Sequence, residues 1–404
     1  MGKKIVILGG GAAGTIAAIN FAEAKRKHGL DMDITVVNKD EWTYMPPLWA
    51  DVALDGLPIE KTRAPIRNLE KYGASVIVKE AKKIEPAERK ILLSDGESIS
   101  YDYLFVTLGL RNGWEGIPGY DKAGYHNYDP QAAVELNKTL RNFKGGKIVI
   151  AVPEVPFRCG IYPMEFATAL GHILHTKGIK SKIVILSPKM PDVGDISWAL
   201  GKDIGKLWHK YFEKYNIEIK RHDGIEKIDD SSRTVSMKEE EETHDRKAVI
   251  TKHFEETYDL LIKVPMPRPP DPLNDPQFLY EQDKRFVKAR PSDFRHPEYD
   301  DIFLTGEHSM PPTGLGTAGV FVDTATLKAL SILLHELYGV GEPTEVHSVA
   351  CVAYSGDKGF LGVCEVEFNG QEYTWRNCYN VAENFVMKII KRAFYQGWLD
   401  KLRI

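Results

Sequence analysis

The sequence predicts an α/β fold with two parallel-sheet units and a C-terminal region that associates with a membrane. Residues 3–20 and 146–174 each carry an apolar strand, a tight turn and a helix. Continuous apolar strands that alternate with helices are typical of a parallel sheet covered on both faces. Residues 381–402 carry apolar side chains at helical spacing, and this pattern predicts a terminal amphipathic helix.

The first turn carries the glycines of a dinucleotide-binding loop. Gly9, Gly11 and Gly14 follow an apolar strand and precede a helix. In such a loop the first glycine permits the turn, the second lets a pyrophosphate approach the backbone, and the third lets the helix pack on the sheet. The amino end of the helix then faces the phosphate charge. The sequence therefore predicts a Rossmann-like domain whose loop, with Ala12 and Ala13, binds one dinucleotide.

Further contacts to this dinucleotide are expected where other strands end. Asn38 follows the strand at 33–37, at the place where an acid usually binds the ribose hydroxyls. The Asn38 amide can bond a hydroxyl without charge, or it can simply cap the strand. Lys39 beside it, and Ala81 after the strand-like run 75–78, are further candidate contacts.

Two later strands end at glycines that predict contacts to a flavin. The buried run 101–109 ends at Gly109, and the run 301–306 ends at Gly306. In flavoproteins with two nucleotide domains the chain returns to the first domain at such a place. A carboxylate there can bond the ribityl chain, so Glu307 is a candidate cofactor contact.

The second strand–turn–helix lacks the glycine loop. Pro153, Pro156, Arg158 and Cys159 follow its strand, where a second dinucleotide would need glycines. We interpret this substitution as one bound dinucleotide and a sulfur centre in place of the other. Arg158 beside Cys159 is expected to favour the thiolate.

Composition excludes several classes of protein. The 404 residues predict two or three domains, and a net charge of −4 gives no basic field for nucleic acid. Four cysteines and twelve histidines show no metal-ligand spacing, so no metal site is expected. Cys364 and Cys378 are expected to be small core residues. No signal peptide and no transmembrane run of about 18 apolar residues is expected.

The terminal helix predicted over 381–402 suits a membrane interface. Tryptophan and phenylalanine lie on its apolar face, and Lys388, Lys391 and Arg392 are placed mainly opposite. A basic amphipathic helix of this kind lies in the plane of the interface. The alternative is a helix packed on the protein's own core or on a second subunit.

The cysteine-bearing segments resemble those of one family. Residues 153–165 read Pro-x-x-Pro-Phe-Arg-Cys-x-x-x-Pro-Met-Glu, residues 350–359 contain a second cysteine, and residues 258–269 end in a proline-rich turn with arginine. These segments resemble the sulfide:quinone oxidoreductases and the related flavocytochrome c sulfide dehydrogenases. In that family a proline-rich turn with a cysteine replaces the NADH-binding glycine loop. The resemblance covers nearly the whole chain.

The resemblance implies a glutathione-reductase-like flavoprotein in which Cys159 and Cys351 form a redox pair facing the flavin. Hydrosulfide would attack their disulfide, leave a persulfide on one cysteine and free the other as a thiolate. That thiolate would pass two electrons to the flavin, which would reduce a quinone dissolved in the membrane. Glu165, at a position where family members often carry an acid, would handle protons.

Two departures from the family pattern change these expectations. Many members carry a third cysteine shortly before the second domain, but residues 124–128 contain none; we therefore expect non-covalent FAD. The family's Pro-Lys-Thr-Gly beside the flavin appears as residues 316–319, without the lysine. The dipole of the helix that starts at Gly319 is expected to stabilise the reduced flavin instead.

The predicted organisation has three parts. Residues 1–143 and 300–338 form the FAD-binding domain, residues 144–299 form the second Rossmann-like domain with a redox cysteine, and residues 339–404 form the C-terminal region. The expected partners are sulfide, a membrane quinone and the membrane surface, and a homo-oligomer is possible. The protein is expected at the cell membrane as a peripheral protein.

Three other functions stay open at this point. A type II NADH:quinone oxidoreductase shares the architecture but needs a glycine loop near 151–160. A flavocytochrome c subunit would use the same cysteines and pass electrons to a haem protein. A non-enzymatic FAD-binding protein would keep the fold, and sulfide would not bleach its flavin.

Overall fold

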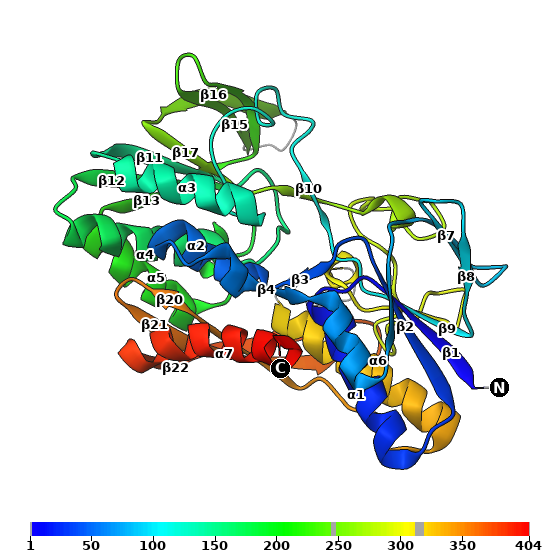
Figure 1. The fold of residues 1–404 in the computed structure, drawn as a ribbon. Coiled ribbons are helices and arrows are strands. Elements are labelled where there is room, and N and C mark those ends of the chain that lie inside the picture. The colour runs from blue at the N-terminus through cyan, green and yellow to red at the C-terminus, as the bar shows by residue number, and fades with distance from the viewer. Residues whose placement is uncertain (1, 244–247, 312–318, 404) are drawn as a thin grey trace.

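The computed structural model describes residues 2–243, 248–311 and 319–403. Figure 1 shows an α/β unit that contains the N-terminus and a second α/β unit, drawn mainly in green, beside it. Helix α7 (Phe385–Arg403) packs against strands of the C-terminal sheet and against β4 (Arg63–Pro65) of the first unit. The two predicted parallel-sheet units and the C-terminal helix are confirmed.

The first unit contains a five-stranded parallel sheet in the order β19-β9-β1-β2-β5. Its central strand, β1, begins with two exposed lysines and continues with four buried apolar residues, Ile5 to Leu8, as expected for a strand covered on both faces. Helices α1 and α6 pack together beside this sheet. Its elements are β1 (Lys3–Leu8), α1 (Ala12–His28), β2 (Met32–Asn38), β5 (Ser75–Val78), β9 (Tyr103–Val106), β19 (Ile302–Leu304) and α6 (Gly319–Tyr338).

The second unit contains a four-stranded parallel sheet in the order β13-β12-β11-β17. Apolar side chains of its helices and strands form one core cluster, which also includes Trp49 and Val52 of α2. Its elements are α2 (Trp49–Asp55), α3 (Pro130–Asn142), β11 (Gly146–Ala151), α4 (Tyr162–Thr176), β12 (Ser181–Pro188), α5 (Lys202–Tyr215), β13 (Ile217–His222) and β17 (Leu260–Lys263).

Small antiparallel sheets complete the two units. Their strands are β3 (Trp42–Tyr44) with β4, β6 (Ala81–Glu85) with β7 (Lys90–Leu93) and β8 (Ser98–Ser100), β10 (Arg111–Gly113) with β18 (Met266–Arg268), and β14 (Gly224–Asp229) with β15 (Thr234–Glu242) and β16 (Val249–Thr257). Short 3₁₀ helices occupy Pro46–Leu48, Ile59–Thr62, Ile66–Tyr72, Ile196–Trp198, Asp271–Leu273 and Glu307–Ser309.

The C-terminal region is an antiparallel sheet of β20 (Ser348–Ser355), β21 (Lys358–Phe368) and β22 (Tyr373–Asn384), followed by α7. Cys364 and Cys378 lie opposite each other on β21 and β22 and form a disulfide. The expectation that both are plain core residues is therefore wrong for their chemistry, although Cys364 is buried. Within the described ranges, no helix is both long and apolar enough to cross a membrane.

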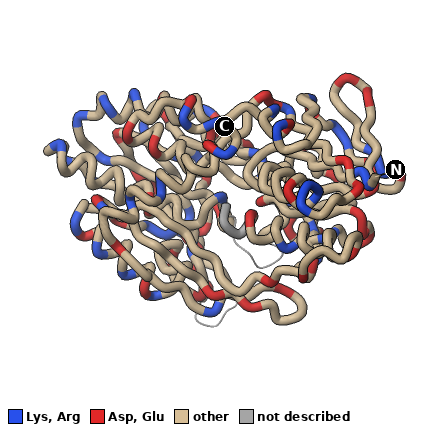
Figure 2. The backbone as a smooth tube through the Cα atoms, turned by 60° about the horizontal axis from the view of Figure 1, so that its bottom comes forward, with Lys and Arg blue, Asp and Glu red and all other residues tan. Residues whose placement is uncertain are grey.

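The predicted domain boundaries at 143 and 300 stay predictions. Leu273, Phe278 and Val287 lie within the predicted second domain, yet they pack with Val37 and Leu304 of the first sheet. Charged residues of both signs are interspersed along the backbone (Figure 2).

Candidate flavin and sulfur site

The predicted dinucleotide contacts gather at one edge of the first sheet. Because its strands are parallel, their carboxyl ends meet at the same edge, where nucleotides bind in open α/β sheets. The candidates at this edge are Gly9, Gly11, Ala12, Ala13 and Gly14 after β1, Asn38 and Lys39 at the end of β2, Ala81 after β5, Gly109 after β9, and Gly306 and Glu307 after β19.

The glycine loop is tightly packed at Gly9 and Gly14 and open at Gly11. A Cβ atom on Gly14 would lie 1.8 Å from the Gly9 carbonyl oxygen, so only glycine permits this packing. Gly9 itself has φ +111°, in the region that favours glycine. A Cβ on Gly11 would meet nothing within 4 Å, and no side chain caps the start of α1. The backbone N–H groups there are thus available to an anion.

Asn38 supports this loop directly. Its Oδ1 accepts a hydrogen bond from the Gly10 N–H at 2.9 Å, and its Nδ2 donates to the carbonyl of Asp40 at 2.7 Å. These bonds agree with the alternative in which Asn38 caps the end of its strand. A ribose contact of Asn38 stays a prediction, as does one of the exposed Lys39.

Glu307 forms an ion pair with Arg158 from the cysteine loop. The Arg158 Nε lies 3.0 Å from the Glu307 carboxylate, and its Nη1 donates to Asn112 at 2.9 Å. Tyr128, within the segment that lacks the family's third cysteine, donates its hydroxyl to the Arg158 carbonyl at 3.3 Å. The cysteine loop is therefore joined to the first unit beside the predicted flavin edge.

Residues 316–318, where the family's lysine is missing, lie outside the described residues. Gly319 is the first residue of α6. Asp323, one turn further, has a buried Oδ1 that accepts no hydrogen bond from any described residue. Burial raises the pKa of this carboxyl from 3.8 to about 7.

Cys159 and Cys351 line one pocket of about 390 Å³. Cys159 precedes α4 and has φ +60°, which is a strained conformation for a residue other than glycine. Cys351 lies on β20. The remaining lining is mostly apolar and includes Val155, Phe157, Ile161, Leu200, Phe360 and Trp375. The two cysteines are not joined by a disulfide in this structure.

Burial makes both thiols weak acids. It raises the pKa of Cys351 to about 12 and that of Cys159 further, and the Glu165 carboxylate adds to both increases. The cation that lowers both pKa values is Lys391. The expectation that Arg158 favours the thiolate stays a prediction; its guanidinium is engaged by Glu307 and Asn112.

Lys391 and Glu165 form a buried ion pair beside the cysteines. Their side chains are 3% and 8% exposed. The Glu165 carboxylate also accepts the backbone N–H of Tyr354 at 2.8 Å, and the Lys391 ammonium lies 3.8 Å from the centre of the Tyr354 ring. The sequence prediction placed Lys391 on the polar face, which is wrong. Its spacing from Tyr395, Trp398 and Leu402 is the signal that places it on the packed face.

Apart from the buried Lys391, the first half of helix α7 is largely exposed, whereas its second half carries the buried apolar residues. Leu399 and Leu402 are buried in the core of the first unit. Apolar side chains that are 38–63% exposed cover the other half and the end of β22; they are Tyr379, Val381, Phe385, Val386, Ile389, Ile390 and Phe394. We call this set the α7 patch. Exposed apolar side chains that form a contiguous patch are typical of an interaction surface.

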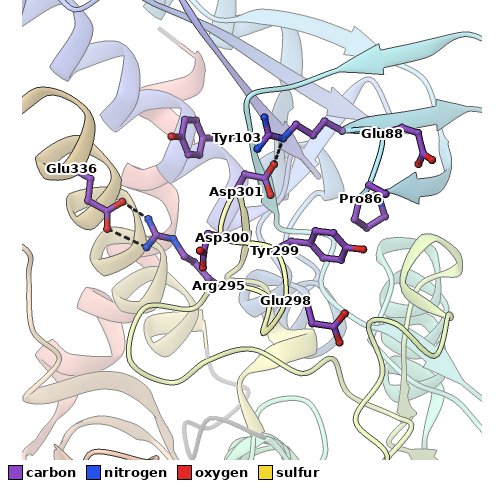
Figure 3. Close-up of a pocket in the computed structure, with 11 residues that line it drawn as sticks. Pro86, Glu88, Tyr103, Arg295, Glu298, Tyr299, Asp300, Asp301 and Glu336 are labelled. Carbon is purple, nitrogen blue, oxygen red and sulfur yellow. Dashed lines mark hydrogen bonds and ion pairs between the residues drawn. The ribbon is translucent and has the colours of Figure 1, made fainter.

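A second pocket, of about 750 Å³, lies at the opposite edge of the first sheet. It is lined by Tyr103 at the start of β9 and by residues just before β19. Figure 3 shows the Arg295 side chain pointing toward Glu336, with which it forms a direct ion pair at this pocket. Arg89 and Asp301 form a second ion pair there, and the pocket lies away from the candidate cofactor contacts.

Comparison with known proteins places this geometry in a family. A mitochondrial sulfide:quinone oxidoreductase from Dictyostelium discoideum is 25% identical over 340 residues, which cover 83% of this chain and 71% of that protein. An alternative NAD(P)H-ubiquinone oxidoreductase from Arabidopsis thaliana is 21% identical over 199 residues, covering 45% of this chain and 38% of that protein.

Among solved structures, the sulfide:quinone oxidoreductase of Aquifex aeolicus superposes with a TM-score of 0.80 at 19% identity, covering 99% of this chain and 91% of that one. The family model described as pyridine nucleotide-disulphide oxidoreductase matches residues 3–254. The chain is therefore an oxidoreductase that belongs to the pyridine nucleotide-disulphide oxidoreductase family.

Proposed function

We propose that this protein is a peripheral membrane flavoenzyme that oxidises sulfide to polysulfide or sulfur and reduces a quinone. The observation that carries the proposal is that Cys159 and Cys351, which come from distant parts of the chain, line the same apolar pocket. Relatives named as sulfide:quinone oxidoreductases support it.

The reaction of sulfide begins with the two cysteines joined as a disulfide. Hydrosulfide attacks one sulfur, a new S–S bond forms as a persulfide, and the other cysteine leaves as a thiolate. The apolar lining of the pocket keeps water away from these sulfur species.

Lys391 and Glu165 handle the charge and the proton of this step. The Lys391 ammonium favours the thiolate electrostatically, and without it both buried thiols would be weaker acids still. The Glu165 carboxylate, held by Lys391 and by the Tyr354 N–H, is an acceptor for the proton of the incoming sulfide.

Membership of the family implies a flavin cofactor, and the residues at the edge of the first sheet fit FAD. The open space at Gly11 and the uncapped start of α1 suit its pyrophosphate. Gly109, Gly306, Glu307 and Gly319 would lie beside the rest of the cofactor. Residues 124–128 offer no cysteine, so we propose non-covalent binding. FAD held there would supply the two-electron redox chemistry that links the thiolate to the quinone.

The α7 patch is proposed to rest in the membrane interface, where quinone is dissolved. Exposed phenylalanine, isoleucine and valine side chains on a helix that also carries lysines match an interfacial helix. The proposed location is the cell membrane.

Anaerobic flavin spectra test the proposal. Sulfide is expected to bleach the flavin absorbance, and a quinone analogue is expected to restore it. Cys159→Ser and Cys351→Ser proteins should bind flavin normally and show no sulfide-dependent bleaching. Normal turnover of sulfide by either variant would remove the two-cysteine mechanism.

A type II NADH:quinone oxidoreductase is the second candidate, because a sequence relative carries such a name. Its cofactor would need an open loop after β11, where this chain has Pro153 and Pro156. Bleaching by NADH and none by sulfide would favour it. Bleaching by sulfide with electrons accepted only by a haem protein would indicate a flavocytochrome c subunit. Flavin that neither reductant bleaches would indicate a non-enzymatic protein.

A further inference from the structure

We propose that the Cys364–Cys378 disulfide is an acceptor for sulfane sulfur, which it receives from a persulfide on Cys351. The proposal rests on the proposed function, since sulfide oxidation supplies the persulfide. It assigns a chemical role to a second pair of cysteines outside the Cys159–Cys351 pair.

The first support is that three of the four cysteines line the same cavity. Cys159, Cys351 and Cys364 all belong to the wall of the 390 Å³ pocket, and Cys364 carries the disulfide to Cys378. Because the wall is apolar, a sulfur species formed in the pocket meets few other groups with which to react.

The strand register places the sulfurs on one face of the sheet. Cys351 lies opposite Gly362, and Val349, two residues before Cys351, lies opposite Cys364. Side chains two residues apart on a strand point to the same face. Cys351 and Cys364 are therefore diagonal neighbours on that face, and Cys378 lies opposite Cys364 on the next strand.

The diagonal spacing favours transfer through an added sulfur over a direct exchange of thiols. Diagonal neighbours in an antiparallel pair lie about 7–8 Å apart, whereas a disulfide seldom joins Cα atoms more than about 7 Å apart. One extra sulfur lengthens the reach of Cys351 by an S–S bond of about 2 Å. A persulfide on Cys351 thus spans a gap that its thiol does not.

Gly362 places no side chain beside Cys351 on this face. It is the residue directly opposite Cys351, and it belongs to the pocket wall. A Cβ on Gly362 would lie 3.1 Å from the Phe360 ring and 3.8 Å from the Cys351 carbonyl oxygen. A larger side chain there would occupy the space between Cys351 and Cys364.

The transfer takes two exchange steps and changes no overall oxidation state. The outer sulfur of the Cys351 persulfide attacks Cys364; an S–S bond forms, the Cys364–Cys378 bond breaks, and Cys378 leaves as a thiolate. This thiolate attacks the transferred sulfur, whose bond to Cys351 breaks, and Cys351 leaves as a thiolate. The products are a Cys364–S–Cys378 trisulfide and the Cys351 thiolate, which carries the negative charge that the persulfide brought.

The transfer moves sulfur toward the surface. Cys364 is 8% exposed, whereas Cys378 is partly exposed on β22. A second hydrosulfide ion then attacks the central sulfur of the trisulfide, so that one cysteine carries a hydrodisulfide and the other leaves as a thiolate. This thiolate attacks the sulfur of the first cysteine, which re-forms the Cys364–Cys378 disulfide and releases a hydrodisulfide ion. The Cys159–Cys351 site is cleared for another cycle.

Mass spectrometry of the flavin-containing protein tests the transfer. The protein is treated anaerobically with sulfide and a quinone analogue, its thiols are alkylated, and it is digested without reductant. The peptide pair joined through Cys364 and Cys378 is expected to gain the mass of one sulfur atom. In the Cys364→Ser, Cys378→Ser double variant the extra sulfur should stay on Cys351. An unchanged peptide pair in a wild-type protein that turns over sulfide would overturn the inference.

Inorganic polysulfide provides an arm that does not depend on sulfide oxidation. It loads thiols with sulfur directly, so the heavier peptide pair should form in the wild-type protein and not in Cys351→Ser. Equal formation in Cys351→Ser would overturn the route through Cys351. If sulfide fails to bleach the flavin while this Cys351-dependent loading occurs, the proposed function fails and the transfer between the sulfurs stands. Retention of the flavin spectrum checks that each variant is folded.

Discussion

Lys391 of α7 and Glu165 of α4 form a buried ion pair whose charges act on both pocket cysteines. Both side chains are almost wholly buried. An isolated charge in such surroundings is unfavourable, so each group requires the other. The pair holds the last helix of the chain against the first turn of α4, directly after the Cys159 loop.

Removing the Lys391 ammonium is expected to destabilise the protein. Lys391→Met leaves the Glu165 carboxylate buried without its cation, which typically costs about 3–5 kcal/mol. Denaturant unfolding should show this loss, and Glu165→Gln added to Lys391→Met should recover part of it. Lys401→Met, at an exposed position of the same helix, should change stability by no more than about 0.5 kcal/mol. Equal effects of the two lysine variants would contradict a special role of the pair.

Two glycines of the dinucleotide loop are expected to respond differently to alanine. Gly14→Ala places a Cβ 1.8 Å from the Gly9 carbonyl oxygen, so it should lower folding stability as well as flavin content. Gly11→Ala meets no protein atom within 4 Å, so it should lower FAD affinity and leave the stability of the flavin-stripped protein unchanged. Gly397→Ala, also in open space but on α7, is the control that should retain flavin. Flavin titration and thermal unfolding distinguish these outcomes.

A charge in the α7 patch is expected to weaken membrane binding without unfolding the protein. Val386 is 55% exposed on α7, and Val249 is 57% exposed on β16, outside the patch. Val386→Asp should reduce sedimentation with liposomes of anionic and neutral lipid, whereas Val249→Asp should not. Both should keep the wild-type melting temperature because neither side chain is buried. Equal binding by the two variants would mean that α7 is not the membrane contact.

Asp323 predicts a pH dependence of stability with a defined sign. Its pKa is raised by burial from 3.8 to about 7. A carboxyl with a raised folded-state pKa stabilises the fold below its unfolded pKa and loses this contribution as pH rises through the folded value. Wild-type stability relative to Asp323→Asn should therefore fall between about pH 4 and pH 7 and level off above. Denaturant unfolding of the wild-type and Asp323→Asn proteins across this pH range checks the prediction.

The sequence was sufficient for features that depend on local pattern. The glycine turn after β1, the apolar parallel strands and the amphipathic terminal helix each follow from residues close together in the chain. The placement of Cys159 and Cys351 in one pocket came from resemblance to a family, because their spacing in sequence carries no geometric information.

Features that depend on the pairing of residues far apart in the chain could not be predicted from local sequence pattern. The Cys364–Cys378 disulfide follows from the pairing of β21 with β22, which contains irregularities that shift the register. Arg158 adjoins Cys159 in sequence, yet its guanidinium is engaged by a carboxylate from beyond β19. The cation that does act on the thiols comes from a helix more than two hundred residues later.

Helix α7 is one continuous rod that carries Lys391 inward and Phe394 outward, less than one turn apart. Any tilt or shift of α7 relative to the strands on which it packs therefore moves the Lys391 ammonium relative to the cysteine sulfur atoms. The exposed apolar side of α7 and the acidity of the thiols are thus mechanically linked by a single stiff element.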